Sequence, residues 1–208
     1  MIKELHDWAC KFPPYVAYFN QKLLENWDKN GRPVPPPHVY KVQTITGLGK
    51  RYGCTCLIET GTFHGEMVST VRKKFADVYS VEIAEHLYKE NRERFKNNCN
   101  VHLYLGDCLD TLPQMIKDAG EAKIIFWLDG HFSSGETGRG KIDDPIYESF
   151  ELVFNELKGK SYAVCVDDAL TFDGKNGSVT LETLLDFIKE QNPEYLEVKD
   201  NIIRFYIA

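Results

Sequence analysis

Glycines and acidic residues recur wherever a short apolar run of this chain ends. The first run, Thr55–Glu59, continues into the loop Glu59-Thr60-Gly61-Thr62-Phe63-His64-Gly65. Its two glycines permit a tight turn and allow a ligand to approach backbone N–H groups closely. The spacing therefore predicts a loop that binds a nucleotide, a property shared by many classes of nucleotide-binding protein.

The second and third apolar runs end in carboxylates as well. Glu82 lies near the end of Val78–Ile83, where an acidic side chain can accept hydrogen bonds from both hydroxyls of a ribose. Gly106 and Asp107 follow Val101–Leu105, in a position to reach the edge of an adenine ring. Taken singly, either carboxylate could cap a helix or face solvent. Taken together, these positions predict a nucleoside pocket formed by Glu59, Gly61, Thr62, Phe63, Gly65, Glu82, Gly106 and Asp107.

Three further carboxylates stand at the ends of the fourth and fifth runs. Asp129 ends Ile124–Asp129, and the pair Asp167-Asp168 follows Tyr162–Val166. Oxygen ligands that converge from adjacent strand ends suit a hard divalent cation such as Mg²⁺. The alternative is that Asp129 and Asp168 cap the loops that follow them. Because an adjacent pair of aspartates repels itself without a positive partner, we favour the metal site.

Strand and helix patterns alternate from residue 41 onward, and this alternation sets where the acids must lie. Helical patterns separate the five runs and follow the last one, around residues 65–75, 84–96, 108–119, 145–158 and 178–191. Each parallel crossover needs a helical return, so the alternation predicts a parallel sheet with helices on both faces. Ligands of such a sheet bind at the carboxyl ends of its strands.

The C-terminal segment ends this alternation. Leu196–Lys199 and Ile202–Ile207 flank Asp200-Asn201, two residue types that tolerate the backbone of a tight hairpin. The expected fold class is therefore α/β. We expect a Rossmann-like three-layer sandwich whose seven-stranded, mostly parallel sheet ends in an antiparallel hairpin.

A proline-rich break at residues 31–37 divides a leader from the main body. With 208 residues the chain is long enough for one well-cored domain. We therefore expect a helical leader over residues 1–40 and the ligand-binding domain over residues 41–208. Residues 14–29 carry aromatic side chains at near-helical spacing, which predicts a helix packed on the body. A lid over a substrate is the alternative.

The charge pattern limits the class of partner. The net charge is −6 with acidic and basic residues interspersed, which argues against a broad surface for nucleic acid or anionic membrane. No apolar run reaches membrane-spanning length and the first residues lack the apolar core of a signal peptide, so we expect a cytoplasmic protein. The six cysteines are scattered without zinc or redox spacing, which favours buried, reduced thiols.

The loop, the acid of the second run and the Gly-Asp pair resemble the class I S-adenosylmethionine-dependent methyltransferases. Addition of Asp129, Asp167 and Asp168 extends the resemblance to the cation-dependent O-methyltransferases of the catechol, caffeoyl-coenzyme A and macrolide-sugar type. The resemblance covers residues 41–207 as separate motifs. It implies S-adenosylmethionine (SAM) as the methyl donor and Mg²⁺ held by the three aspartates. The acceptor it implies is a hydroxyl of a small molecule, with a sugar as one candidate.

Two positions extend or break this resemblance. Lys41-Val42-Gln43 stands where those enzymes begin a helix that covers the methionine part of the cofactor. The catechol type carries a lysine three residues beyond the metal-binding aspartate, where this chain has Phe132. His131 then becomes the candidate catalytic base beside Asp129, because its pKa range suits removal of a proton from a metal-acidified hydroxyl. A structural role for this histidine is the alternative.

Two functions of other classes remain as alternatives. The chain could be a binding or scaffolding subunit that keeps the nucleoside pocket without catalysis. It could also be an NAD-dependent oxidoreductase, although such domains usually carry G-x-G-x-x-G, and Thr62 and Phe63 follow Gly61 here. Neither a nucleic-acid partner nor a membrane span is expected, and the sequence leaves open whether two copies pair as a homodimer.

Overall fold

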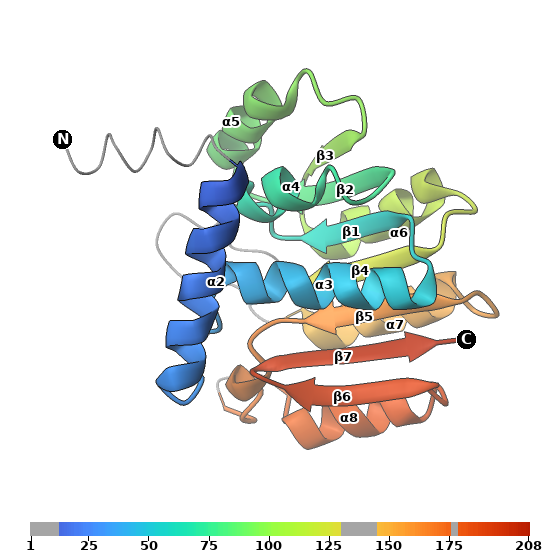
Figure 1. Cartoon of the computed structure of the whole chain (residues 1–208). Helices are drawn as coiled ribbons and strands as arrows, with labels where there is room; N and C mark the ends of the chain where they lie inside the picture. Colours follow the sequence, from blue (N-terminus) through green and yellow to red (C-terminus); the bar gives the residue numbers. More distant parts are fainter. Residues whose placement is uncertain (1–12, 130–144, 176–178) are drawn as a thin grey trace.

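A seven-stranded sheet forms the centre of the molecule in the computed structural model, which describes residues 13–129, 145–175 and 179–208. The strand order is β3-β2-β1-β4-β5-β7-β6 (Figure 1). Neighbouring strands from β3 to β5 are parallel, whereas β7 is antiparallel to both β5 and β6. The strands are β1 (Cys56–Thr60), β2 (Asp77–Glu82), β3 (Val101–Leu105), β4 (Ile124–Leu128), β5 (Tyr162–Val166), β6 (Tyr195–Lys199) and β7 (Ile202–Ile207). The predicted fold class, including its terminal hairpin, is confirmed.

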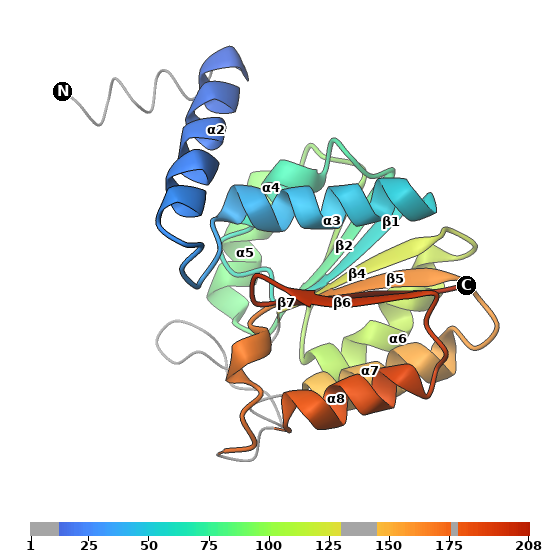
Figure 2. The ribbon, with the colours of Figure 1, turned by 60° about the horizontal axis from the view of Figure 1, so that its bottom comes forward.

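Helices cover both faces of this sheet, as Figure 2 shows with the sheet nearly edge-on. One face carries α3 (His38–Tyr52), α4 (Glu66–Val71) and α5 (Glu85–Phe95). The other face carries α6 (Cys108–Ala119), α7 (Ile146–Glu156) and α8 (Leu181–Lys189). A short 3₁₀ helix, η1 (Ala169–Thr171), follows β5. The three layers are those predicted for a parallel sheet with helical crossovers.

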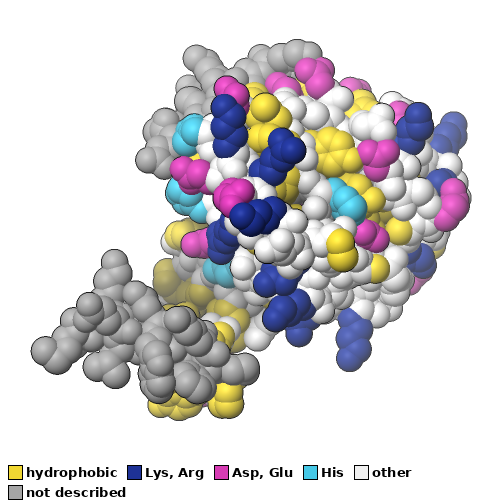
Figure 3. All heavy atoms as spheres, turned by 90° about the horizontal axis from the view of Figure 1, so that it is seen from above, with side chains coloured by type: hydrophobic (Ala, Val, Ile, Leu, Met, Phe, Trp, Pro, Cys, Tyr) yellow, Lys and Arg dark blue, Asp and Glu magenta, His cyan; other side chains and the backbone are white. Residues whose placement is uncertain are grey.

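The surface mixes charges of both signs. On the face seen in Figure 3, Lys and Arg side chains lie among Asp and Glu side chains. Within the part of the chain that the structure describes, no helix combines the length and the apolar character needed to cross a membrane. The cysteines of these ranges are free, as predicted; Cys56 and Cys165 are buried, whereas Cys99 is exposed.

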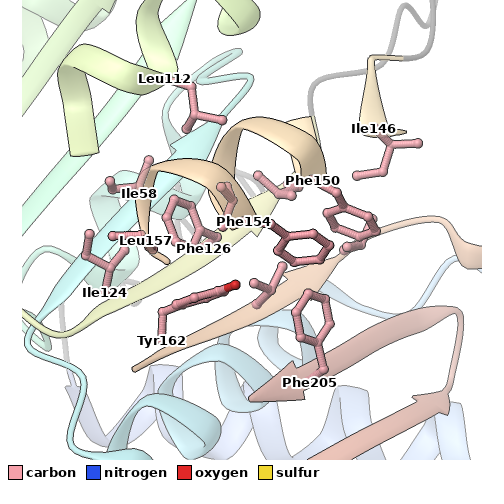
Figure 4. Close-up of a cluster of buried hydrophobic side chains, with 14 of the residues drawn as sticks. Ile58, Leu112, Ile124, Phe126, Ile146, Phe150, Phe154, Leu157, Tyr162 and Phe205 are labelled. Carbon is pink, nitrogen blue, oxygen red and sulfur yellow. The ribbon is translucent and has the colours of Figure 1, made fainter. Parts of the chain in front are cut away.

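Alternate residues of each central strand face the two helical layers. In β4, Ile124, Phe126 and Leu128 belong to the cluster packed against α6, α7 and α8, whereas Ile125 and Trp127 belong to the cluster packed against α3 and α4. All five residues are buried, as expected for a strand covered on both faces. Figure 4 shows the first cluster, in which rings from β4, α7 and β7 pack together. Burial of each such side chain stabilises the fold by about 1.5–3 kcal/mol and holds the strand ends in register.

The helices depart from the sequence prediction in two places. Helix α3 begins at His38, directly after Pro37, whereas the resemblance to the O-methyltransferases implies a helix start at Lys41. Helix α4 ends at Val71 and not near residue 75. The chain turns there because Phe75 packs into the core and Ala76 donates its N–H to the carbonyl oxygen of Thr55 at 2.8 Å. Strands β3, β5 and β7 have the predicted bounds.

Helix α2 (Pro13–Lys29) confirms the predicted leader helix and lies beside the edge at which β1 and β5 end (Figure 1). It is attached mainly at its C-terminal end. Trp27 is buried, its Nε1–H donates to the carbonyl oxygen of Pro33 at 2.7 Å, and its ring centroid lies 4.7 Å from that of Tyr40. Tyr18 and Phe19 are 60% and 38% exposed, so the packing does not extend along the whole aromatic stripe.

Candidate active site

The predicted site residues that lie within the described ranges converge at one edge of the sheet. Strand order reverses between β1 and β4, which lie side by side and parallel. Glu59 and Glu82 lie at the ends of β1 and β2, and Asp129 and Asp167 directly follow β4 and β5. Because parallel strands end at the same edge, the sheet brings these acids to the place where ligands of open α/β sheets bind.

The loop after β1 turns through three residues with positive φ. Gly61, Phe63 and Gly65 have φ values of 87°, 47° and 70°, a region that glycine enters without steric cost. The N–H groups of Gly61 and Thr62 both donate to the carbonyl oxygen of Val81 at 3.0 Å. The loop is thereby tied to β2, and the Phe63 side chain is 44% exposed.

Glu82, the last residue of β2, holds this loop through its carboxylate. Its Oε2 accepts the N–H of Phe63 at 2.7 Å, and its Oε1 accepts the N–H of Ala84 at 2.9 Å. The residue is buried. A carboxylate has about four acceptor sites, so two backbone donors leave capacity for the ribose hydroxyls that the sequence predicts Glu82 to bind.

Helix α5 holds the same loop through two side chains that belong to no motif in the sequence. Asn91 is buried, and its Nδ2 donates to the carbonyl oxygens of Phe63 and Leu87, the latter at 3.0 Å. Arg94 donates to the carbonyl oxygen of His64. Asn91 lies on the apolar face of α5, one turn after the buried Leu87. A polar residue at a buried helical position needs partners, and this is the signal that could have identified it.

A buried chain of hydrogen bonds links β1, β2 and the loop. Ser80 Oγ donates to Glu59 Oε2 at 2.6 Å and lies 2.6 Å from Thr62 Oγ1. Burial raises the pKa of Glu59 to about 8; the Ser80 hydrogen bond opposes this shift, and the charges of Asp129 and Glu82 add to it. Near neutral pH this carboxyl group is therefore largely protonated, and it can donate a hydrogen bond as well as accept one.

Gly106 and Asp107 lie directly after β3. Gly106 has a φ of 150°, and its N–H donates to the carbonyl oxygen of Glu82 at 3.0 Å. Asp107 caps helix α6, since its Oδ1 accepts the N–H of Leu109 at 2.9 Å. The capping role that the sequence allows for Asp107 is therefore present, and its contact with an adenine ring stays a prediction.

Three aspartates meet at the ends of β4 and β5. Asp129, Asp167 and Asp168 each offer one carboxylate oxygen, and these oxygens lie within 4.8 Å of one another. The N–H of Asp129 donates to Thr60 Oγ1 at 3.2 Å, and that of Asp167 donates to the carbonyl oxygen of Leu128 at 3.1 Å. These contacts between neighbouring strand ends set the spacing of the acidic cluster, and the predicted convergence of the three acids is confirmed.

Asn201 supports the backbone and side chain of Asp168. Asp168 has a left-handed backbone, with φ 54° and ψ 42°. Asn201 Nδ2 donates to Asp168 Oδ1 at 2.9 Å, and Asn201 Oδ1 accepts the N–H of Leu170 at 2.8 Å. The sequence predicts Asn201 only as a turn residue of the C-terminal hairpin. The tertiary structure shows that this turn also positions one acid of the cluster.

Lys41 from helix α3 supplies the positive partner that the aspartate pair requires. Its Nζ forms a close ion pair with Asp167 Oδ2, and the two side chains are 18% and 1% exposed. Burial alone would lower the pKa of Lys41, but Asp167, and then Asp129 and Asp168, outweigh it and raise the pKa. The lysine is therefore charged at neutral pH. Because 126 residues separate Lys41 from Asp167, no local pattern could have paired them.

The acids of the cluster respond to burial and to one another. Burial raises the pKa of Asp129 to about 8, the charge of Asp167 adds to the shift, and Lys41 opposes it. Burial also raises the pKa of Asp167, against the opposing charge and hydrogen bond of Lys41. Asp129 and Asp167 therefore gain from an additional cation, because a nearby positive charge favours their charged forms.

The donor set of the acidic cluster fits a hard divalent cation. All three candidate ligands are carboxylates, and within the described residues Asp167 Oδ1 is buried without a hydrogen-bond partner. When all groups are ionised, the three carboxylates and the ammonium group of Lys41 leave two negative charges. Mg²⁺ binds in proteins through carboxylates of this kind, with waters or substrate oxygens completing the octahedron.

His131, the predicted base, lies outside the described residues, between the ranges that end at residue 129 and resume at residue 145. Its position follows Asp129 by two residues in the chain, and its role stays a prediction.

The comparisons with known proteins identify the fold. No family model matches this chain, and no curated protein does. The O-methyltransferase TomG of Streptomyces achromogenes, solved with SAM, has a TM-score of 0.59 at 14% identity over 91% of this chain and 88% of its own. An O-methyltransferase of Bacillus cereus, solved with S-adenosylhomocysteine (SAH), has a TM-score of 0.57 at 15% identity over 91% of this chain and 90% of its own.

A third structure, the SAH-bound methyltransferase PaMTH1 of Podospora anserina, has a TM-score of 0.58 at 14% identity. It covers 92% of this chain and 93% of its own. The three likenesses run over almost the whole length of each protein. They show that this chain has the Rossmann-like fold of the class I methyltransferases, as the sequence motifs predict.

Proposed function

We propose that this chain, because it has the fold of the class I methyltransferases, transfers a methyl group from SAM to a hydroxyl oxygen of a small molecule. The observation that carries the proposal is a juxtaposition at one sheet edge. A loop braced by Glu82 lies there with three aspartates whose oxygens are within 4.8 Å of one another. The loop suits a methyl donor that contains a nucleoside, and the three aspartates suit an acceptor that reacts through oxygen. TomG was solved with SAM, which supports the choice of donor.

The donor would lie along the ends of β1, β2 and β3. Glu82 would accept the ribose hydroxyls, and the loop from Glu59 to Gly65 would face the methionine part with its backbone. Asp107 would contact the adenine edge. Leu105 and Phe63 are both 44% exposed, and they offer apolar surface to the flat adenine ring.

The acceptor would lie at the ends of β4 and β5. Asp129, Asp167 and Asp168 would hold Mg²⁺, which when bound lowers the pKa of a coordinated hydroxyl and orients it. An acceptor with two neighbouring oxygens, such as a sugar or a catechol, suits this chemistry. The acceptor oxygen forms a bond to the methyl carbon as the S–CH₃ bond breaks in line, and S-adenosylhomocysteine leaves. His131 would take the hydroxyl proton.

Calorimetric titration with SAM, with and without Mg²⁺, tests the donor site. We expect saturable binding by the wild type. Glu82→Gln replaces one acceptor oxygen with an NH₂ group that faces a backbone N–H, so we expect SAM to bind about tenfold more weakly or worse. Glu90→Gln, an exposed position on α5, is the matched control and should bind as the wild type does. Absence of SAM binding in both conditions would refute the proposal.

A second assay separates catalysis from binding alone. Protein mixed with SAM and a set of sugars and catechols should release S-adenosylhomocysteine, and EDTA should reduce the rate. SAM binding without release on any acceptor would favour the scaffolding alternative. An NADH fluorescence titration addresses the oxidoreductase alternative, and we expect no change in fluorescence.

A further inference from the structure

Lys41 is the positively charged residue that contacts the acidic cluster in the described ranges. It comes from helix α3, whereas the three aspartates follow strands of the sheet. It lies in the first turn of α3, with its Nζ on Asp167 Oδ2 and 5.9 Å from the centroid of the Trp127 ring. Asp129 and Asp168 also act on its charge. The side chain therefore contacts Asp167 directly and is close enough to Asp129 and Asp168 to feel their charges.

The two oxygens of Asp167 have different environments. Lys41 contacts Oδ2, whereas Oδ1 is buried without a hydrogen-bond partner among the described residues. A buried carboxylate oxygen without a partner is costly unless something binds it. Lys41 thus neutralises Asp167 through one oxygen and leaves the other available to a further ligand.

The charges of the cluster explain why a lysine and a divalent cation are compatible. Three ionised carboxylates without Lys41 would place three negative charges in a largely buried space. With Lys41 two remain, and a divalent cation neutralises them. The ammonium group and the bound cation would nevertheless repel each other at short range through a medium of low dielectric constant.

We propose that Lys41 is the resident counter-ion of this cluster: it keeps the three carboxylates together before a divalent cation binds, and its charge weakens the binding of that cation. The proposal rests on the metal site of the proposed function. It has two consequences. Removal of the lysine charge strengthens cation binding, and it makes the folded protein more dependent on the cation.

Mn²⁺ titration followed by electron paramagnetic resonance tests this proposal without any methyl acceptor. The variants are Lys41→Met, which removes the charge at similar length, and Lys41→Arg, which keeps the charge. Lys50→Met, at an exposed position in the last turn of α3, makes the same change in net charge away from the site. We expect Lys41→Met to bind Mn²⁺ about tenfold or more tightly than the wild type, and Lys41→Arg and Lys50→Met to stay within about threefold of it.

Thermal melting supplies the second readout. In EDTA, Lys41→Met should melt at a lower temperature than Lys50→Met, and Mn²⁺ should restore more of its melting temperature than it adds to the wild type. If Lys41→Met does not fold, Lys41→Gln replaces it, because glutamine lacks the charge but can still donate a hydrogen bond to Asp167.

Equal or weaker Mn²⁺ binding by the uncharged variants would overturn the proposal, and so would Mn²⁺ binding by neither the variants nor the wild type. Binding by the uncharged variants alone would support it, since the lysine would then exclude the cation. SAM titration of the same samples without a cation reports on the donor site separately. Failure of the counter-ion proposal is thereby distinguished from failure of methyl transfer.

Discussion

Replacement of Gly65 by alanine tests how the cofactor loop is held. Gly65 precedes α4 with φ 70° and ψ 26°. A Cβ atom there would lie 2.3 Å from Asn91 Oδ1 and 2.8 Å from Phe95 Cε2. Both distances are too short for real contacts, so the loop or α5 must move. Asn91 also donates to the carbonyl oxygen of Phe63, so a shift of Asn91 would disturb the loop itself.

Gly53 offers a matched control for the backbone term. Its φ of 70° and ψ of 31° are almost those of Gly65, but nothing lies within 4 Å of a Cβ built there. Gly53→Ala should therefore cost only the left-handed strain of a residue with a Cβ, about 1–2 kcal/mol in the free energy of unfolding. Gly65→Ala adds overpacking of about 1–3 kcal/mol, for a total of about 2–5 kcal/mol. The smaller entropy of the unfolded alanine chain is common to both variants and cancels in the comparison.

Equilibrium unfolding in urea measures the two free energies, and calorimetry with SAM measures the consequence for the loop. We expect Gly65→Ala to lose more stability than Gly53→Ala and to bind SAM more weakly, while Gly53→Ala binds SAM as the wild type does. Equal losses of stability in the two variants would refute the reasoning, because the clash of the added Cβ atom with Asn91 would then cost no stability.

Three further predictions concern pH, the hairpin turn and the leader. Burial raises the pKa of Glu59 from 4.5 to about 8. The stability that its bound proton provides is complete below pH 4.5 and is lost as the pH rises to about 8. The unfolding free energy of the wild type should therefore fall with pH in this window, and Glu59→Gln should make that fall shallower by about 1.4 kcal/mol per pH unit. Asn201→Gly keeps the left-handed turn but removes two side-chain hydrogen bonds, and it should lose about 1–3 kcal/mol in urea unfolding and weaken Mn²⁺ binding. Asn192→Gly, another left-handed asparagine, is its control and should do neither. Trp27→Ala should cost about 3 kcal/mol, whereas Tyr18→Ala, at a position 60% exposed, should stay within about 0.5 kcal/mol of the wild type; similar losses would show that the two ends of α2 are held alike.

Much of the fold is readable because buried parallel strands leave a clear local trace. Ile124–Leu128 and Tyr162–Val166 are continuous apolar runs bounded by turns, and every residue in them is buried. Short apolar runs of this length are typical of strands covered on both faces. The ends of helices are less readable. Helix α4 stops at Val71 because Phe75 must enter the core, which the helical pattern of the segment does not reveal.

Helix α2 of the leader was predictable as a helix, but its packing was not. Its aromatic spacing predicts the helix correctly, since helical periodicity is a local property. The aromatic pattern does not reveal which side chains of that helix are buried against the rest of the protein. In the structure Trp27 is buried and donates a hydrogen bond to the carbonyl oxygen of Pro33, whereas Tyr18 and Leu23 are exposed.

The sequence by itself determined which residue types stand at the strand ends, because the direction of each parallel strand assigns its last residues to one edge of the sheet. That is why Asp129, Asp167 and Asp168 could be expected to meet, and why Glu82 could be expected beside the loop. Only the tertiary structure decided what holds these acids. Lys41 reaches Asp167 from helix α3, and Asn201 reaches Asp168 from the terminal hairpin. Asn91 of helix α5 holds the neighbouring loop through the carbonyl oxygen of Phe63. Their contacts depend on how separate elements dock, and docking is set by the packing of side chains far apart in the chain.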